Sequence, residues 1–115
     1  MPTTTIFDKI LQREIPAQTV YEDPCVLAFR DISPQAPVHV LVIPKKKWEH
    51  FSDLGNADPL EVGEFFTRVA KVATALNLDK SGYRVVINHG RDGQQSVEYL
   101  HAHILGGRGL TWPPG

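Results

Sequence analysis

The stretch "VEYLHAHILGGR", residues 97–108, carries the pattern that best predicts both the fold and the chemistry of this chain. Side chains alternate between two faces along a strand, so His101 and His103 share a face. The two faces are Tyr99, His101, His103 and Leu105 on one side, and Leu100, Ala102 and Ile104 on the other. We therefore expect a strand over residues 97–105 whose apolar face packs on the core, while its histidine face points outward toward a ligand.

Apolar periodicity and turn residues predict the elements upstream of this strand. The expected helices cover residues 6–15, ended by Pro16, and 59–76, and the other expected strands cover residues 19–23, 25–31, 38–44 and 83–88. This order, with short connections between strands, predicts an α+β domain with a mostly antiparallel five-stranded sheet. We expect one long and one short helix on one side of the sheet. A single domain would span residues 1–115, with 106–115 as an irregular tail.

Alternation and helical periodicity also predict which side chains are buried. In the strand over 38–44, one face should consist of Val38, Val40 and Val42. The other face should consist of His39, Leu41 and Ile43. The long helix should begin after an Asp58 cap, with Pro59 in its first position and Glu61 completing a capping box. Its buried stripe should consist of Val62, Phe65, Phe66, Val69, Val72, Ala73 and Leu76.

Composition limits the classes of function. The formal net charge is −1, which gives no reason to expect capture of nucleic acid or of a membrane surface. The basic run at 45–47 is expected on a solvated loop. Cys25 is the one cysteine, so it forms no internal disulfide; we expect it to be a small buried side chain in a strand, in a reducing compartment. Neither a signal peptide nor a transmembrane run is visible, and we expect a cytoplasmic or nuclear location.

Two imidazoles on one face could ligate a metal, could divide nucleophilic and proton-handling work, or could be a hydrogen-bonded structural pair. A zinc site usually has three or four protein ligands. The remaining histidines are His39, His50 and His89, and no spacing motif joins any of them to the pair. We therefore expect neither a metal site nor a cofactor.

Five segments, taken in order, resemble the histidine triad family, in its Hint branch of nucleoside phosphoramidate hydrolases. They are "TIFDKI" with "REIPA", then "DISPQAPVHVLVIPKK", "GYRVVINHGRDGQQSV", "HAHILGGR" and the final "WPPG". The resemblance therefore runs through nearly the whole chain.

The resemblance implies a nucleotidyl-histidine mechanism that needs no metal. His101 takes the position of the nucleophile, and His103 lies near the phosphate and the leaving group. Ser96 is a further hydrogen-bond donor, and His39 matches a family histidine close to the triad. Tyr99 stands where the family has its first triad histidine, so this chain has two of the three.

The same resemblance implies a nucleotide pocket and a dimer. Its candidate nucleotide-binding residues are Phe29, Arg30, Asp31, Ile32, Asn88, Gln94, Gln95 and Val97, with Ile6 and Phe7 as additional candidates. Asp31 can accept both ribose hydroxyls, and Gln94 replaces a usual glycine. Trp112 in the tail would reach the partner's active site in a homodimer, which the long helix and a strand edge would join.

The expected activity is hydrolysis of purine nucleoside phosphoramidates, and of aminoacyl or lysyl adenylates, to the nucleoside monophosphate. The alternative is a nucleotide-binding regulatory or scaffold protein with vestigial catalysis, which the Tyr99 and Gln94 changes would favour. A dinucleoside polyphosphate hydrolase is a third reading, against which the "WPPG" tail and the "QSV" spacing argue. The expected ligand is a purine nucleoside monophosphate or phosphoramidate.

Overall fold

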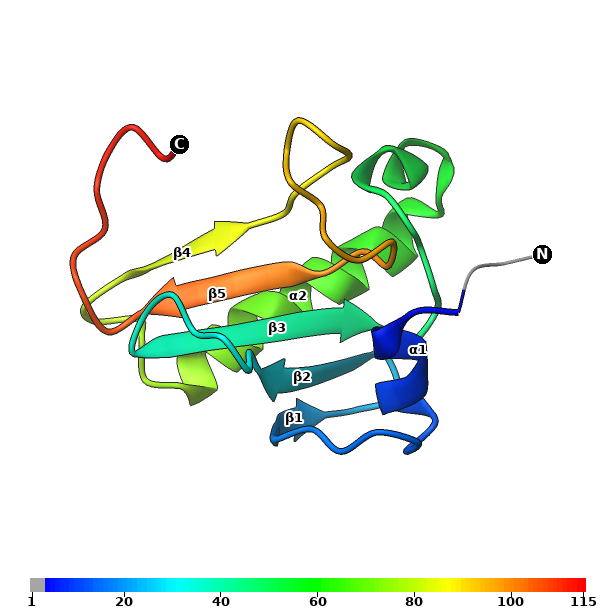
Figure 1. Cartoon of the computed structure of the whole chain (residues 1–115), viewed down its shortest axis with the longest axis horizontal. Helices are drawn as coiled ribbons and strands as arrows, with labels where there is room; N and C mark the ends of the chain where they lie inside the picture. The colour runs from blue at the N-terminus through cyan, green and yellow to red at the C-terminus, as the bar shows by residue number, and fades with distance from the viewer. Residues whose placement is uncertain (1–3) are drawn as a thin grey trace.

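Two α-helices, a short 3-10 helix and five strands make up the computed structural model, which describes residues 4–115 (Figure 1). In chain order they are α1 (Ile6–Leu11), β1 (Thr19–Glu22), β2 (Val26–Arg30), β3 (Val38–Pro44), η1 (Phe51–Asn56), α2 (Pro59–Ala75), β4 (Tyr83–Val86) and β5 (Ala102–Gly106). The predicted order of helices and strands is confirmed, and η1 was not predicted. The expected domain boundary at residue 1 lies outside the described residues.

The sheet places β5 in its interior. The strand order is β1-β2-β3-β5-β4, and every neighbouring pair is antiparallel. His103 on β5 stands opposite Leu41 of β3 and Val86 of β4, while His39 of β3 stands opposite Leu105. The predicted five-stranded α+β architecture is therefore confirmed, and the fold brings two histidines from distant parts of the chain onto adjacent strands.

The helices cover opposite faces of the sheet, and the expectation that both lie on one side is wrong. Val40 and Val42 face the core beneath α2, whereas Leu41 and Ile43 face a second apolar cluster that contains Phe7 of α1. Figure 1 shows α2 behind the sheet and α1 in front of it. The reason is that both faces of β2 and β3 carry large apolar side chains, so each face needs a cover.

The start of α2 agrees with the predicted cap but not with the capping box. The Asp58 side chain accepts a hydrogen bond from the Leu60 N–H at 3.0 Å, and Pro59 occupies the first turn. Glu61 instead pairs with Lys46 at 2.7 Å. The centre of the predicted stripe is buried, at Phe65, Val69, Val72 and Ala73, whereas Val62, Phe66 and Leu76 at its margins are partly exposed.

The last strand begins at Ala102, so the predicted start at residue 97 is wrong. Residues 97–99 form bends, residues 100 and 101 have no regular structure, and the Leu100 N–H bonds to the carbonyl of Trp48 rather than to a neighbouring strand. The predicted alternation still holds, because Leu100, Ala102 and Ile104 all join the core beneath α2. Helix α1 ends at Leu11 and β4 at Val86, four and two residues before their predicted ends, while β1, β2 and α2 differ from their predicted bounds by one residue at one or both ends.

The expected outward histidine face is instead largely covered by α1. Tyr99 is 1% exposed and His101 is 4% exposed. Phe7 of α1 meets the rings of both residues edge to face. The helix is held by a capping box between Thr5 and Asp8, whose carboxylate also pairs with Lys47 at 3.0 Å. A six-residue helix thus forms one wall of the site.

Other details of the sequence interpretation change as well. Cys25 lies in the turn before β2 and is half-buried, with its thiol 3.6 Å from a Glu64 oxygen, so its placement in a strand was wrong. The lysines at 45–47 are each paired with a carboxylate rather than simply solvated. Within residues 4–115 no helix has the length and apolar character needed to span a membrane.

Candidate active site

A cavity of about 380 Å³ lies between α1, the end of β2 and the segment that leads into β5. Its lining residues are Ile6, Phe7, Ile10, Ile15, Pro16, Ala17, Phe29, Arg30, Asp31, Ile32, Leu41, Ser96, Val97, His101 and His103. Most of this wall is apolar, and its polar groups gather on the side of the two histidines. An apolar cavity with a few convergent polar groups is the usual form of a small-molecule site.

His101 is held in one tautomer by the main chain. Its Nδ1 lies 2.6 Å from the carbonyl oxygen of Tyr99. A carbonyl can only accept, so Nδ1 carries the hydrogen and Nε2 keeps its lone pair. Burial lowers the pKa of His101, although the Tyr99 carbonyl and Asp31 act in the opposite direction. The imidazole is therefore neutral near pH 7 and has an unprotonated nitrogen available for attack.

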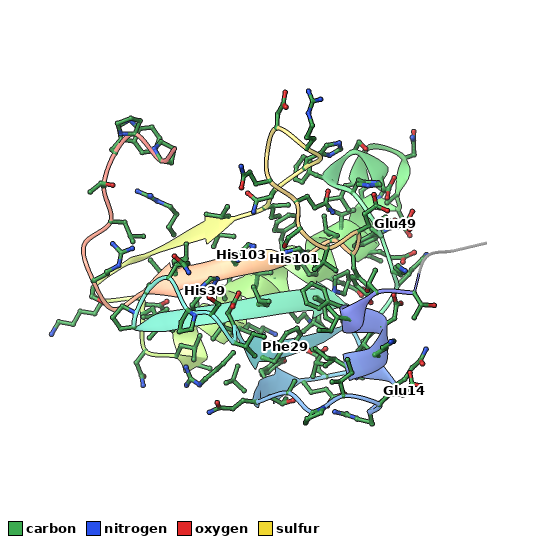
Figure 2. The ribbon with its side chains drawn as sticks, in the orientation of Figure 1. Glu14, Phe29, His39, Glu49, His101 and His103 are labelled. Atoms are coloured by element: carbon green, nitrogen blue, oxygen red, sulfur yellow. The ribbon has the colours of Figure 1, made fainter. Side chains whose placement is uncertain are left out.

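His39 and His103 form a second, linked pair. The main-chain N–H of Gln35 donates to His39 Nδ1 at 3.0 Å, so the hydrogen of His39 must be on Nε2. His39 Nε2 lies 2.9 Å from His103 Nδ1, which it therefore reaches as a donor. His103 must then carry its own hydrogen on Nε2. Figure 2 shows His39, His103 and His101 close together over adjacent strands, with Phe29 below them.

The Nε2–H of His103 is an unused donor. Of the buried side-chain nitrogens and oxygens in residues 4–115, it is the one without a hydrogen-bond partner. The pKa of His103 is lowered to about 4, chiefly by burial and in smaller part by the neighbouring imidazoles His101 and His39, against the opposing effect of Asp31. Burial likewise lowers the pKa of His39, against the opposing effect of Asp31. A buried donor without a partner in a pocket wall is suited to an oxygen of a bound ligand.

Comparison with known proteins agrees with this arrangement. The family model for the HIT domain matches residues 12–110. The chain belongs to the HIT, or histidine triad, family. It is 52% identical over 113 residues to a 14 kDa zinc-binding protein of Zea mays, an alignment that covers 96% of this chain and 88% of the relative.

Solved structures of HIT proteins superimpose closely on this HIT domain. A HIT family hydrolase from Legionella pneumophila has a TM-score of 0.91 and 47% identity, covering 97% of this chain and 100% of that one. A histidine triad protein from Clostridium difficile has a TM-score of 0.84 and 42% identity, with 96% and 97% covered. The fold is therefore that of a family that includes a protein described as a hydrolase.

Tyr99, which the resemblance places at the first triad position, is buried next to His101 in this HIT domain. Its hydroxyl donates to the carbonyl of Pro44 at the end of β3, and its ring carries the Lys47 ammonium 5.4 Å from the centroid. Burial raises the pKa of the Tyr99 phenol, so the group stays neutral in the physiological range. Tyr99 thus lies behind His101 as an uncharged support rather than in the cavity.

Five other predicted residues lie outside the cavity lining: His39, described above, and Asn88, Gln94, Gln95 and Trp112. The Gln95 amide is used by the chain itself, since it bonds to the main chain of Gly90, Glu49 and Val97. Gln94 is exposed and has a left-handed φ of 61°. Asn88 is half-buried after β4, and Trp112 is 80% exposed in the tail, with the guanidinium of Arg84 over its ring.

The sequence interpretation missed part of the apolar wall. Ile10, Ile15, Pro16, Ala17 and Leu41 line the cavity but were not proposed as ligand contacts. The segment 15–17 is apolar although it lies outside regular structure, and this composition was the available signal. Apolar residues in a loop need a partner surface, and here they close one side of the pocket.

Three side chains of the site could also hold a metal ion. Ligand atoms of Asp31, His39 and His103 lie within 4.8 Å of one another. The Asp31 Oδ2 is 3.4 Å from His39 Nε2, close to the ligand spacing of about 3.3 Å in tetrahedral zinc sites. The histidine pair at 2.9 Å would need to separate slightly. The set could hold a zinc ion with an open fourth position, at the expense of two hydrogen bonds. One is the bond between the imidazoles, and the other runs from the Gln35 N–H to His39 Nδ1, because a neutral His39 that ligates through Nε2 carries its hydrogen on Nδ1.

Proposed function

We propose that this HIT protein hydrolyses purine nucleoside phosphoramidates, and aminoacyl or lysyl adenylates, to the nucleoside monophosphate through a nucleotidyl-histidine at His101. The observation that carries the proposal is the hydrogen bond from His101 Nδ1 to the Tyr99 carbonyl, at 2.6 Å. It leaves a neutral imidazole with a free Nε2 in the wall of the cavity.

The first step joins His101 Nε2 to the α-phosphorus and breaks the bond from phosphorus to the leaving nitrogen. The departing nitrogen takes up one proton from solvent and leaves as an amine. With an aminoacyl adenylate the bond from phosphorus to the acyl oxygen breaks instead, and a carboxylate leaves without taking up a proton. The phosphorylated imidazole retains its Nδ1–H on the Tyr99 carbonyl, which stabilises the positive charge that develops on the ring. In the second step water attacks phosphorus, the bond to Nε2 breaks, and water releases one proton, so the overall reaction consumes one water molecule.

His103 and Ser96 would bind the phosphoryl oxygens. The Nε2–H of His103 has no partner within the described chain, and Ser96 lines the same cavity with its hydroxyl. Donors placed where negative charge increases in the transition state give a large part of the rate enhancement in such reactions. In this proposal His39 acts only through His103.

The nucleoside would occupy the apolar part of the cavity. Phe29 and Ile32 are aromatic and aliphatic surfaces on which a purine can pack, and Ile32 is 96% exposed at the cavity rim. Asp31 lies between Phe29 and Ile32 in the sequence, and its Oδ2 is 3.4 Å from His39 Nε2. Its other oxygen, Oδ1, already accepts the Ser33 N–H at 2.8 Å. The Oδ2 atom is suited to ribose hydroxyls.

We also propose that the protein acts as a homodimer. Trp112 is 80% exposed, and Tyr83 and Val85 on the edge strand β4 are about 40% exposed, at 39% and 41%. Large apolar side chains exposed near an open sheet edge are typical of an interface. Light scattering after size-exclusion chromatography should give twice the monomer mass.

The alternative is a nucleotide-binding regulatory or scaffold protein with vestigial catalysis. Tyr99 in place of a titratable triad residue and Gln94 in a strained conformation favour it. A zinc ion on Asp31, His39 and His103, suggested by the name of the maize relative, would leave such a protein structured but inactive.

The test compares turnover of an adenosine phosphoramidate with a fluorescent amine, in chelator, by the wild type, His101→Ala and His50→Ala. His50 is the matched control, since its side chain is 32% exposed and it lies outside the cavity lining. We expect His101→Ala to lower kcat by about 10³-fold or more and His50→Ala to have little effect. If all three are inert while adenosine monophosphate still binds, the alternative replaces the enzyme.

A further inference from the structure

The loop between β2 and β3, residues 31–37, determines the tautomer of His39. Its Gln35 N–H donates to His39 Nδ1, and this main-chain bond places the hydrogen of His39 on Nε2, where the Asp31 carboxylate at 3.4 Å also favours it. Through the 2.9 Å contact to His103 Nδ1, it also fixes the hydrogen of His103 on Nε2. His103 can therefore donate to a ligand from Nε2 only while the Gln35 N–H keeps its position against His39.

This loop has no regular structure of its own, and a residue after β5 holds it. The guanidinium of Arg108 donates from Nη2 to the Gln35 carbonyl at 2.9 Å and from Nη1 to the Gly109 carbonyl at 3.0 Å. In Figure 1 the loop lies at the end of the sheet where β5 finishes. Arg108 therefore holds the carbonyl of the same residue whose N–H contacts His39.

The chain geometry at Gly107 brings Arg108 into range. Gly107 has a φ of 87°, and a Cβ at this position would lie 2.9 Å from Pro37 Cβ. Only glycine adopts this backbone conformation without strain, and only glycine leaves the space for the loop to approach. The tail and the loop are thus in direct contact beside the histidines.

We propose that Arg108 is a positioning residue for the reaction: by holding Gln35, it keeps the protons of His39 and His103 on their Nε2 atoms. The part of this inference that concerns catalysis rests on the proposed function. The part that concerns the tautomers does not, because it follows from which atoms donate and which accept. The guanidinium itself is exposed and is not among the cavity-lining residues.

The experiment measures imidazole tautomers by long-range ¹H–¹⁵N correlation at neutral pH, in the wild type, Arg108→Ala and Arg108→Lys. We expect protonated Nε2 and unprotonated Nδ1 on His39 and His103 in the wild type. Arg108→Ala should give mixed tautomers on both rings. It should also lower kcat by about tenfold and weaken the binding of adenosine monophosphate, because the phosphate loses the same donor. Arg108→Lys keeps one donor and should restore the wild-type pattern in part.

Two controls separate this role from general destabilisation. Arg91→Ala removes an exposed arginine whose side chain is 94% accessible, and Gln35→Ala removes the side chain but keeps the amide; both should retain wild-type tautomers. Unchanged tautomers in Arg108→Ala would overturn the proposal, whatever the kinetics. If the wild type shows no turnover but Arg108→Ala still shifts the tautomers, the positioning role is supported and the proposed function is rejected.

Discussion

The Nδ1 of His101 lies 2.6 Å from the main-chain carbonyl of Tyr99, so the proposed nucleophile is oriented by the backbone of its neighbour and not by that neighbour's side chain. A carbonyl is present whatever the residue type. If Tyr99 replaces the first triad histidine, as the resemblance implies, the exchange leaves the orienting contact in place. Tyrosine changes the packing behind the site. It also removes a third imidazole, which could have titrated near neutral pH.

Tyr99→Phe should consequently affect stability more than catalysis. The substitution leaves the Pro44 carbonyl without its hydroxyl donor, at a cost of about 1–3 kcal/mol of unfolding free energy. We expect kcat to change by less than about threefold, since the Tyr99 carbonyl remains. Denaturant unfolding and steady-state kinetics measure the two effects. Tyr83→Phe, on an exposed tyrosine of β4, is the control, and a large fall in kcat at unchanged stability would contradict the argument.

The pH dependence of stability should reflect His103. Its pKa is about 4 in the folded chain and about 6.5 in an unfolded one, so only the unfolded state binds a proton between these values. The unfolding free energy should therefore fall as pH decreases from about 6.5 toward 4, by about 1–2 kcal/mol at pH 5, with no contribution above this window. In His103→Gln the slope between pH 7 and pH 5 should be shallower. Identical slopes would show that His103 is not held neutral by burial.

Asp31→Asn should weaken the binding of the ribose. We expect KM to rise by about tenfold, because a charged acceptor for hydroxyl groups becomes neutral, with a smaller change in kcat. The difference between a ribonucleoside and a 2′-deoxyribonucleoside substrate should shrink in parallel. Asp92→Asn, whose side chain is 90% accessible on the polar loop, is the matched control. A variant that still discriminates between the two sugars would place the ribose elsewhere.

Zinc should inhibit the enzyme rather than activate it. An ion on His39 and His103 would replace the hydrogen bond between them and occupy the phosphate side of the cavity. We expect chelator to restore full activity and Asp31→Asn to weaken inhibition, as followed by titration of turnover against Zn²⁺. Activation by zinc would instead indicate a metal-dependent mechanism.

The core between the sheet and α2 could be predicted from the sequence, because the apolar pattern of each element that forms it is local to that element. Alternation along 38–44 and the helical stripe from Phe65 to Ala73 both place apolar residues on the faces that meet in the core. The partial exposure of Val62, Phe66 and Leu76 at the margins of that stripe was less predictable, since it depends on how far neighbouring elements extend over the helix. Strand ends were also less predictable, as the bends before Ala102 show.

The other side depends on contacts between segments that no local pattern connects. His101 and His103 share a face as predicted, but the cover over His101 comes from Phe7, more than ninety residues earlier in the sequence. The tautomer of His103 depends on a loop amide at Gln35, which no side-chain pattern reveals. Gln95 was read as a ligand contact, yet its amide is satisfied by the surrounding main chain.

The alternation of β3 between two apolar clusters has a consequence for how this protein tolerates change. Val40 and Val42 belong to the cluster beneath α2. On the other face, His39 contacts His103 and Leu41 lines the cavity. A saturation mutagenesis scan along this strand should thus give a signal with a period of two residues. Even-numbered positions should govern abundance in the cell alone. Odd-numbered positions should affect turnover at His39 and Leu41, and abundance as well at Leu41 and Ile43, because those two side chains are also buried in the second apolar cluster.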